Sequence, residues 1–444
     1  MVEQALPKGT TVPPAWSTVA DPDDVSGDWL KSFADPGLNT MVAEAIANNL
    51  DLRQAAARVE VARQTVVVVG ARMLPQVGVH IGGASLRAEG QDGSFQSNAE
   101  YAGVVWEVDL WGRLRAQRAA TEAGFEASAL DYAFARQSLA ATTAQSWYLA
   151  IETRQLLTLA EQSVAIYSEL LDLVRVRRAA GKVADLDVAE ASANLNSAQS
   201  QFRIAQGNYS EARRNLEVLV GRYPAAELEV AEHFAPLPPA VPAGLPSSLL
   251  ARRPDLVAAE QQVVAAFRTT EAARLALLPS IALTLDGGRL GDRVLDVLRL
   301  NPWLVHAVIG MKIPIYEGGA LMAQIEIATA QQAQTVAQYG AAVLAAFNEV
   351  EGALTNQQLL AQRLPYQHDA LADRSEAVRI ARVKYEAGAI DMLSVLQLQE
   401  AQLTSEADLV KLRNAQLANR IQLHLALGGS FDSAPAAHIN AARD

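Results

Sequence analysis

The chain has 444 residues, of which 50% are apolar and only 6% aromatic, and it carries a formal net charge of -12 at pH 7. Its sequence pI near 5.1 argues against a partner with a phosphate backbone, so nucleic-acid binding is excluded from the functions considered. The chain has no cysteine, which excludes a disulfide scaffold, a thiol nucleophile and thiolate metal sites.

The two ends of the sequence carry little patterning. Residues 1–20 lack an apolar segment behind a basic one, which predicts that the sequence begins as a mature or trimmed chain. No run of 18 or more apolar residues occurs, so no helix is expected to span a bilayer. We expect an extended N-terminal segment over 1–38 and a C-terminal tail over 430–444.

The second half of the chain repeats the first, 204 to 207 residues later. The matched residues of the first copy are Ala47, Asp51, Leu52, Ala62, Leu74, Pro75, Val176, Gly181, Leu186, Val188, Leu216 and Gly221. Their counterparts are Ala251, Asp255, Leu256, Ala266, Leu278, Pro279, Val383, Gly388, Leu393, Val395, Leu423 and Gly428. Such a period is too long for a solenoid. We therefore expect two structural repeats, 39–222 and 247–429, joined by a proline-rich equatorial linker at 223–246.

Each repeat contains two segments in which apolar and polar or small residues alternate. The predicted strands are 76–88, 99–110, 280–288 and 302–314, with outward loops near 89–98 and 287–301. One side of the strands is apolar, and the other includes His80, Glu107, Asp109 and Lys312, as a water-filled lumen requires. This pattern is typical of a transmembrane β-barrel, and four strands are too few to close one without further copies. A half-buried soluble sheet alternates in the same way and remains the alternative.

Long helices are predicted after each strand pair. Residues 76–223 contain no proline, and a helix over 113–180 would be roughly 100 Å long. The spacing of Leu149, Leu156, Leu159, Ile166, Leu170 and Leu173 predicts a coiled-coil seam. Gly181 and Gly388 stand where a helix should end in a left-handed residue, so each repeat is expected to carry a helical hairpin with its tip at a glycine. Pro365 is expected to kink the second long helix or to mark a local insertion.

Several short sequence motifs follow one another in a distinctive order along the chain. They are 28–36 (DWLKSFADP), 109–113 (DLWGR), 249–256 (LLARRPDL), 314–319 (PIYEGG), 347–351 (FNEVE) and 385–388 (YEAG). In order and spacing they resemble the TolC- and NodT-type family of outer-membrane efflux channels, over roughly residues 28–430.

The resemblance implies a mainly α fold with a membrane β-barrel. A homotrimer would form one twelve-stranded barrel among the lipids of the outer membrane of a Gram-negative bacterium, continued by a long periplasmic α-helical barrel. The helix tips would dock onto a periplasmic adaptor (membrane fusion) protein and, through it, an inner-membrane transporter. Many relatives carry a lipidated N-terminal cysteine, which this chain lacks, so a lipid anchor on the native form stays open.

The same resemblance implies a gate just past the tip glycines. Leu393 matches the apolar gate position of related channels, whereas Gln397 stands where an aspartate ring is common and Ile390 replaces a locking arginine. Asp391, Asp187 and Glu190 are further gate candidates. The expected adaptor-contacting residues are Ala180, Gly181, Lys182, Ala387, Gly388 and Ala389. The acids could equally cap helices and Leu393 could pack in a seam.

Four aromatic residues flank the predicted strands: Trp106, Trp111, Trp303 and Tyr316. They are candidates for anchors at the membrane interface, and packing beneath the barrel is the alternative.

Nothing in the sequence predicts an enzyme, a metal or a cofactor. There is no glycine-rich phosphate loop and no Ser/His/Asp arrangement, and the six histidines show no metal-ligand spacing. The preferred function is a passive exit duct for small molecules such as drugs, toxic compounds or metal ions. A type I secretion channel for polypeptides and, in another class, a soluble coiled-coil scaffold remain alternatives.

Overall fold

The structure, a computed structural model, describes residues 2–18, 27–87, 94–291 and 304–431. The chain divides into two compact units, which we name by their main feature. The sheet unit comprises 1–10, 56–131 and 255–342, and the hairpin unit comprises 11–55, 132–254 and 343–444. Four of the helices contribute residues to both units, because the unit boundaries fall within them.

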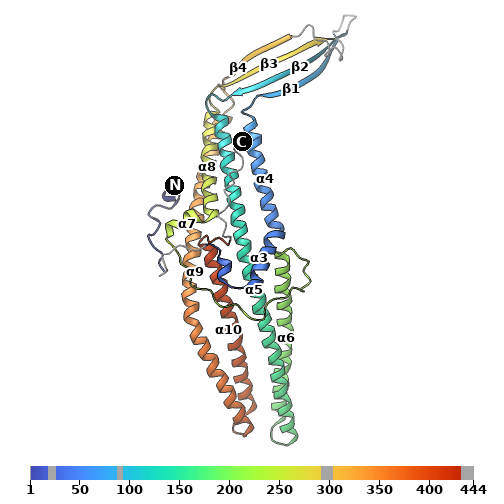
Figure 1. The fold of residues 1–444 in the computed structure, drawn as a ribbon, viewed down its shortest axis with the longest axis vertical. Helices are drawn as coiled ribbons and strands as arrows, with labels where there is room; N and C mark the ends of the chain where they lie inside the picture. Colours follow the sequence, from blue (N-terminus) through green and yellow to red (C-terminus); the bar gives the residue numbers. More distant parts are fainter. Residues whose placement is uncertain (1, 19–26, 88–93, 292–303, 432–444) are drawn as a thin grey trace. The chain divides into compact units, whose positions relative to one another are not determined.

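The sheet unit contains one antiparallel sheet in the order β1-β2-β3-β4 (Figure 1). Its strands are β1 Gln76–Arg87, β2 Ser94–Val108, β3 Ser280–Gly291 and β4 Leu304–Lys312. Among the described strands, β1 pairs only with β2 and β4 only with β3, so each leaves one backbone edge unpaired. Strands β2 and β3 extend further toward the loops than the alternation predicts, because backbone pairing can continue where the side-chain pattern ends.

Each strand pair is entered and left through a helix. α4 (Leu50–Ala71) leads into β1 and α8 (Pro254–Leu275) leads into β3, each through a Leu-Pro pair. α5 (Arg113–Ala179) follows β2, and α9 (Ala320–Glu386) follows β4. The same helix-strand-strand-helix order therefore occurs twice, in the two halves where the sequence repeats.

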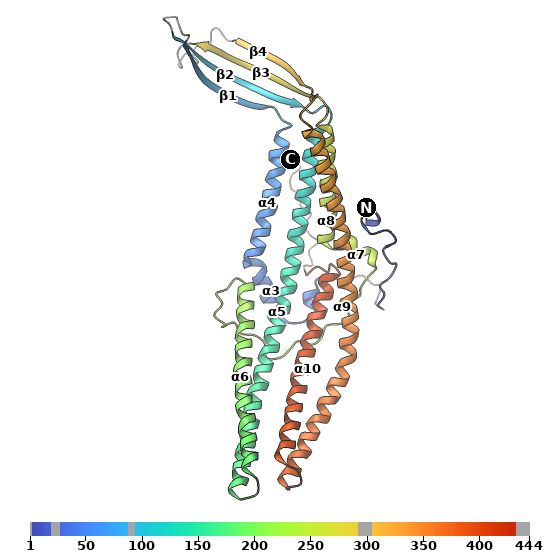
Figure 2. The same cartoon turned by 180° about the vertical axis from the view of Figure 1, so that it is seen from behind.

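The hairpin unit holds two helical hairpins. α5 runs beside α6 (Asp185–Leu219), and α9 runs beside α10 (Met392–Ala426), each pair joined by a short turn (Figures 1 and 2). The remaining helices are α1 (Val2–Ala5), α2 (Trp29–Ser32), α3 (Pro36–Asn48) and α7 (Pro246–Arg252). Residues 1–38, expected to be extended, thus include α1, α2 and the start of α3, while 432–444 of the predicted tail lie outside the described residues.

A buried cluster gathers α2, α3 and the middle of α5. Asp35 caps α3 by accepting a hydrogen bond from the Leu38 backbone N–H at 3.0 Å, and Pro36 occupies the first helical position. The second Asp35 oxygen accepts from the indole of Trp147 at 2.9 Å. The DWLKSFADP segment, residues 28–36, therefore packs Trp29 and Phe33 into the core of the hairpin unit.

Two glycines show that the repeat is also a structural symmetry. Gly221 and Gly428 follow the C-terminal ends of α6 and α10 with φ of 78° and 70°. A Cβ at Gly221 would lie 2.9 Å from the Cβ of Asn48, and one at Gly428 would lie 3.0 Å from the carbonyl of Arg252. The end of α6 thus contacts the chain just before α4, and the end of α10 contacts the chain just before α8. Only glycine fits at these two close approaches.

This geometry makes a stability prediction. We expect Gly221→Ala to lower the free energy of unfolding by about 1–3 kcal/mol, because alanine is strained at positive φ and its Cβ meets Asn48. Gly124→Ala is the matched control: Gly124 is helical with open space around it, so alanine should be neutral or stabilising by about 0.5–1 kcal/mol. Denaturant unfolding in detergent measures both. Equal stability of the two variants would contradict the close approach at Gly221.

The coiled-coil seam predicted for α5 is only partly right. Of its six residues, Leu170 is buried and Ile166 and Leu173 pack against the same buried cluster, whereas Leu149 is 43% exposed. The fully buried residues of α5 in this cluster are Tyr167, Leu170, Leu171 and Val174. The leucine spacing therefore matches the buried face only near the hairpin tip, because residues three and four apart recur on more than one face of a long helix. α9 continues unbroken through Pro365, so no inserted segment occurs there.

Candidate functional site

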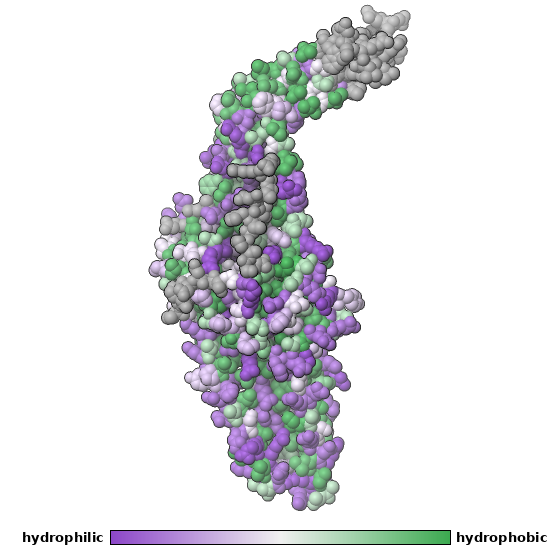
Figure 3. Space-filling model, in the orientation of Figure 1, coloured by the Kyte–Doolittle hydropathy of each residue, from purple (hydrophilic) through white to green (hydrophobic). Residues whose placement is uncertain are grey.

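The sheet has two chemically different faces. One face is apolar along all four strands, and several of its side chains are largely exposed, with Val77 at 77%, Val305 at 73% and Ile309 at 78%. The described members of this apolar face are Val77, Val79, Ala102, Val104, Trp106, Val108, Ile281, Leu283, Leu285, Val305, Ala307, Ile309 and Met311. Figure 3 shows hydrophobic residues gathered over the described part of the sheet. A continuous exposed apolar patch of this kind marks a surface that contacts lipid or protein.

The opposite face is polar or small. Its described members are Gln76, Gly78, His80, Gly103, Val105, Glu107, Ser280, Ala282, Thr284, Asp286, Gly288, His306, Val308, Gly310 and Lys312. Glu107 forms an ion pair with Arg113 at 2.5 Å, and Lys312 forms one with Glu317 at 3.3 Å. The sheet thus presents one face suited to a bilayer and one suited to water.

The aromatic candidates divide into three groups. Trp106 and Trp111 donate from their indole nitrogens to the backbone carbonyls of Met73 at 2.9 Å and Pro279 at 2.8 Å, which lie at the junctions before β1 and β3. Tyr316 is 87% exposed. Trp303 lies outside the described residues. Each tryptophan therefore links the β2 region to the segment that enters a strand, Trp106 to the segment before β1 and Trp111 to the segment before β3.

Each hairpin tip is built by a glycine. Gly181 has φ of 71° and Gly388 has φ of 75°. In both, a backbone N–H one residue past the glycine reaches back five residues: Lys182 to Arg177 at 2.9 Å, and Ala389 to Lys384 at 2.8 Å. All six expected tip residues (Ala180, Gly181, Lys182, Ala387, Gly388 and Ala389) are exposed. The tips are accordingly two exposed turns, each closed by backbone hydrogen bonds.

The gate candidates take different positions around these tips. Leu393 is 43% exposed, and Gln397, one turn further along α10, is exposed on the same side. Asp391 caps α10 by accepting from the Ser394 backbone N–H at 2.9 Å and the Ser394 hydroxyl at 2.5 Å. These hydrogen bonds hold the pKa of the Asp391 carboxyl below its usual value.

The acids of the first hairpin are also near a helix start. Asp187 accepts a hydrogen bond from the backbone N–H of Ala184 at 2.8 Å, the return bond of a helix cap. Glu190 is half-buried one turn further along α6. Asp187 and Asp391 therefore both cap helices, a role that leaves their remaining oxygens available to solvent or a partner.

One contact at the tips has no counterpart among the sequence predictions. Arg177, in the last turn of α5, donates to the backbone carbonyls of Tyr385 at 2.8 Å and Glu386 at 2.7 Å, at the end of α9. Its guanidinium carbon also lies 4.2 Å from the centroid of the Tyr385 ring. Arg177 thus joins the first hairpin to the second. The only sequence signal is its position four residues before Gly181, which does not distinguish it from an ordinary cation at a helix C-terminus.

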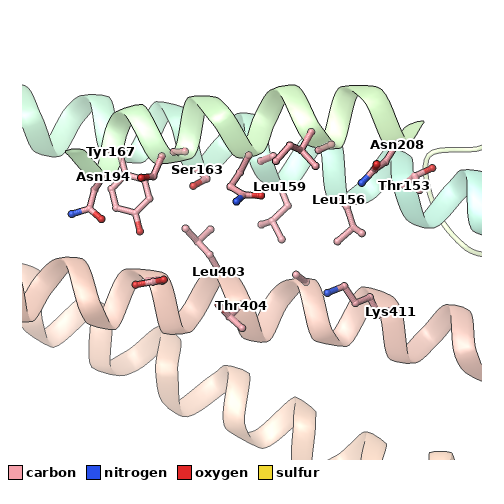
Figure 4. Close-up of a pocket in the computed structure, with 18 residues that line it drawn as sticks. Thr153, Leu156, Leu159, Ser163, Tyr167, Asn194, Asn208, Leu403, Thr404 and Lys411 are labelled. Carbon is pink, nitrogen blue, oxygen red and sulfur yellow. The ribbon is translucent and has the colours of Figure 1, made fainter. Parts of the chain in front are cut away.

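A groove of about 550 Å³ runs along the hairpin unit between the α5–α6 hairpin and α10. In Figure 4, Leu156 and Leu159 point from α5 toward α10, and Leu403 points from α10 toward α5 and α6. Hydroxyl and amide side chains such as Thr153 and Asn194, and the charged Glu400 and Lys411, also line it. Two leucines of the predicted seam therefore face a mixed groove and not a dry core.

The described part of the chain contains neither a candidate membrane-spanning helix nor a candidate metal site. None of its helices is both long enough and apolar enough to cross a membrane. No three histidine, cysteine or acidic side chains among the described residues are placed to hold a metal ion.

Comparison with known proteins places these features in a family. The model of a family described as outer membrane efflux protein matches residues 41–222 and 245–429. The pyoverdine export outer membrane protein OpmQ of Pseudomonas aeruginosa is 32% identical over 446 residues, covering 96% of this chain and 93% of OpmQ. The cation efflux system protein CusC of Escherichia coli is 28% identical over 407 residues, covering 91% of this chain and 88% of CusC.

Solved structures agree with the sequence relatives. The outer-membrane channel OprN has a TM-score of 0.85 and 25% identity, covering 96% of this chain and 99% of OprN. The CmeC outer membrane channel of Campylobacter jejuni has a TM-score of 0.89, covering 97% of this chain and 96% of CmeC; at 20% identity it shows the fold alone.

Proposed function

The chain belongs to the outer membrane efflux protein family, which consists of channels and not enzymes, and from this premise we propose that it forms a homotrimeric exit duct in the outer membrane. Three copies would each contribute β1 to β4 to a twelve-stranded barrel, and their helices would continue it as a periplasmic tube. Substrates would pass through this duct passively after an energised inner-membrane transporter delivers them.

The two-faced sheet is the observation that supports this proposal best. Its apolar face carries exposed apolar side chains on β1, β3 and β4, which would be costly in water and is favourable in hydrocarbon. Among the described strands, the outer strands β1 and β4 each leave one edge unpaired, and a lipid-exposed sheet must pair every edge. Pairing β1 of one copy with β4 of the next satisfies both edges and closes a barrel with the polar face inside.

The hairpin tips are the proposed periplasmic gate and adaptor-binding site. Gly181, Gly388 and their neighbours are exposed turns that a periplasmic adaptor protein can contact. Three copies of Leu393 and Gln397 would line the narrowest part, with Asp391, Asp187 and Glu190 around it. Because Gln397 is uncharged, the ring at that position would lack the carboxylates that bind cations strongly. Arg177 would stabilise the closed arrangement by joining the two hairpins of each copy.

Small molecules are the proposed substrates. Relatives across nearly the whole chain are named for pyoverdine export, cation efflux and toluene efflux. Another relative is named for antibiotic efflux, so the names of the relatives cover drugs, toxic compounds and metal ions. The tryptophans Trp106 and Trp111, with Tyr316, would lie at the level of the lipid headgroups.

The oligomeric state tests the proposal directly. We expect the chain, exported behind a signal peptide, to leave outer membranes only with detergent and to run as a trimer by size exclusion with light scattering. Planar bilayers containing the purified trimer should show discrete conductance steps. A water-soluble monomer or dimer would refute the duct and favour a coiled-coil scaffold.

A further inference from the structure

A hollow of about 350 Å³ lies on the polar face of the sheet. It exists because two glycines, Gly78 of β1 and Gly103 of β2, are paired directly opposite each other and bring no side chain to this place. Gln76, Val105 and Thr284 form its walls together with His80 and Asp286.

Two titratable side chains lean into this space over the glycines. A Cβ placed on Gly103 would collide with Oδ1 of Asp286, so the carboxylate lies across the backbone of the neighbouring strand. A Cβ placed on Gly78 would lie 3.6 Å from Nε2 of His80, so the imidazole lies over the adjacent glycine. Glycine at both positions is therefore what allows the acid and the imidazole to approach from β3 and β1.

A second imidazole, that of His306, lies beside the Asp286 carboxylate. His306 of β4 is directly opposite Asp286 in the register, and its Nδ1 lies 4.0 Å from Oδ2 of Asp286. The His306 side chain is 71% exposed and that of Asp286 26%. We name His80, Asp286 and His306 the lumen triad. It crosses the whole sheet, from one edge strand to the other.

The other charged side chains described on this face lie further along the strands, away from the hollow. Glu107 of β2 pairs with Arg113 at 2.5 Å, and Lys312 of β4 pairs with Glu317 at 3.3 Å. Both pairs lie toward the end of the strands where the helices begin, and each has one charge of either sign. Among the described side chains, the net charge at the level of the hollow is therefore set by the lumen triad.

We propose that the lumen triad is an ion-selectivity site whose sign depends on pH. This rests on the proposed trimer, which would place three triads around one water-filled lumen. With neutral imidazoles, the three carboxylates make this level negative and attract cations. When the imidazoles are protonated, positive charges outnumber the carboxylates two to one, so anions are favoured.

The test is the reversal potential of the purified trimer in planar bilayers under a roughly tenfold KCl gradient. We expect a K⁺ to Cl⁻ permeability ratio above one at about pH 8, falling at least roughly threefold at about pH 5, below the ordinary pKa of an imidazole. The double variant His80→Asn with His306→Asn should keep the ratio of the wild type at high pH and lose its pH dependence. Asp286→Asn should lose the cation preference at high pH.

His368→Asn is the matched control. His368 is also an exposed histidine beside an acid, with Nδ1 3.8 Å from Oδ1 of Asp369, but it lies on α9 of the hairpin unit. This variant should respond to pH as the wild type does. A conducting trimer whose permeability ratio does not change with pH, or a double variant that still responds, would overturn the lumen triad alone. Absence of any conducting trimer would overturn the proposed duct, and the triad with it.

Discussion

Arg177→Ala is expected to raise the time-averaged conductance of the reconstituted channel several-fold. The substitution removes both hydrogen bonds to the carbonyls of Tyr385 and Glu386 and the stacking on the Tyr385 ring. A hydrogen bond from a charged donor is worth about 1.5–3 kcal/mol, so their loss in each copy should outweigh a closed-state preference of a few kcal/mol. Single-channel recording at low voltage measures the open probability.

Two further variants distinguish the contact between the hairpins from the positive charge of Arg177. Arg175→Ala is the matched control, because Arg175 is an exposed arginine of the same helix that pairs with Asp172 at 3.3 Å within α5. It should leave the conductance unchanged. Arg177→Lys keeps the charge but loses the planar fork that reaches two carbonyls, so it should fall between wild type and Arg177→Ala. If Arg175→Ala opens the channel as much as Arg177→Ala, the hairpin link is not the cause.

Glu217→Ala is expected to lower the free energy of unfolding by about 3 kcal/mol or more. Glu217 is 2% exposed, and its carboxylate accepts hydrogen bonds from the backbone N–H groups of Ala226 at 2.7 Å, Glu227 at 2.7 Å and Leu228 at 2.9 Å. These bonds fix the start of the equatorial linker onto the end of α6. Alanine would leave the donors without a partner. Guanidinium unfolding in detergent, followed by tryptophan fluorescence, measures the loss.

The effect of Glu217 should depend on pH in a defined direction. Burial alone would raise the pKa of Glu217, but the three backbone N–H groups outweigh it and hold the pKa below its ordinary value of 4.5. Its stabilisation is therefore fully present above that value and lost as the pH falls through the folded pKa. The stability difference between wild type and Glu217→Ala should shrink below about pH 4.5. Glu229→Ala, at an exposed acid of the same linker, should be neutral at every pH.

The repeat explains why Glu217 could not be assigned from sequence. At the step of 207 residues, which aligns Leu216 with Leu423, its counterpart is His424. His424 instead stacks on Trp29 of the DWLKSFADP segment, with ring centroids 5.7 Å apart. Burial and the nearby Arg420 lower the pKa of His424 to about 4. The two equivalent positions thus contact different parts of the chain, the linker in one repeat and helix α2 in the other, a difference that depends on contacts far apart in sequence.

Local patterns were sufficient for the four strands, the long hairpin helices and the family, but not for the short helices within residues 1–38. Strand alternation marked the apolar and polar faces of the sheet, because side chains in a strand point to opposite sides in turn. Glycine at 181 and 388 marked the hairpin tips, because a left-handed residue ends a helix. The order of short motifs identified the efflux-channel family, since order and spacing together are far more specific than any one segment.

Tertiary structure alone decided which residues meet. Arg177 reaches across 208 positions to Tyr385, and Glu217 gathers three amides of the linker; neither contact has a local period that a sequence could display. The buried face of α5 likewise follows the leucine spacing only near the hairpin tip, because the neighbouring helices determine which face is covered. The lumen triad depends on strand register, which places Asp286 opposite both Gly103 and His306. Periodicity fixes what each element is, whereas pairing and packing fix what its side chains contact.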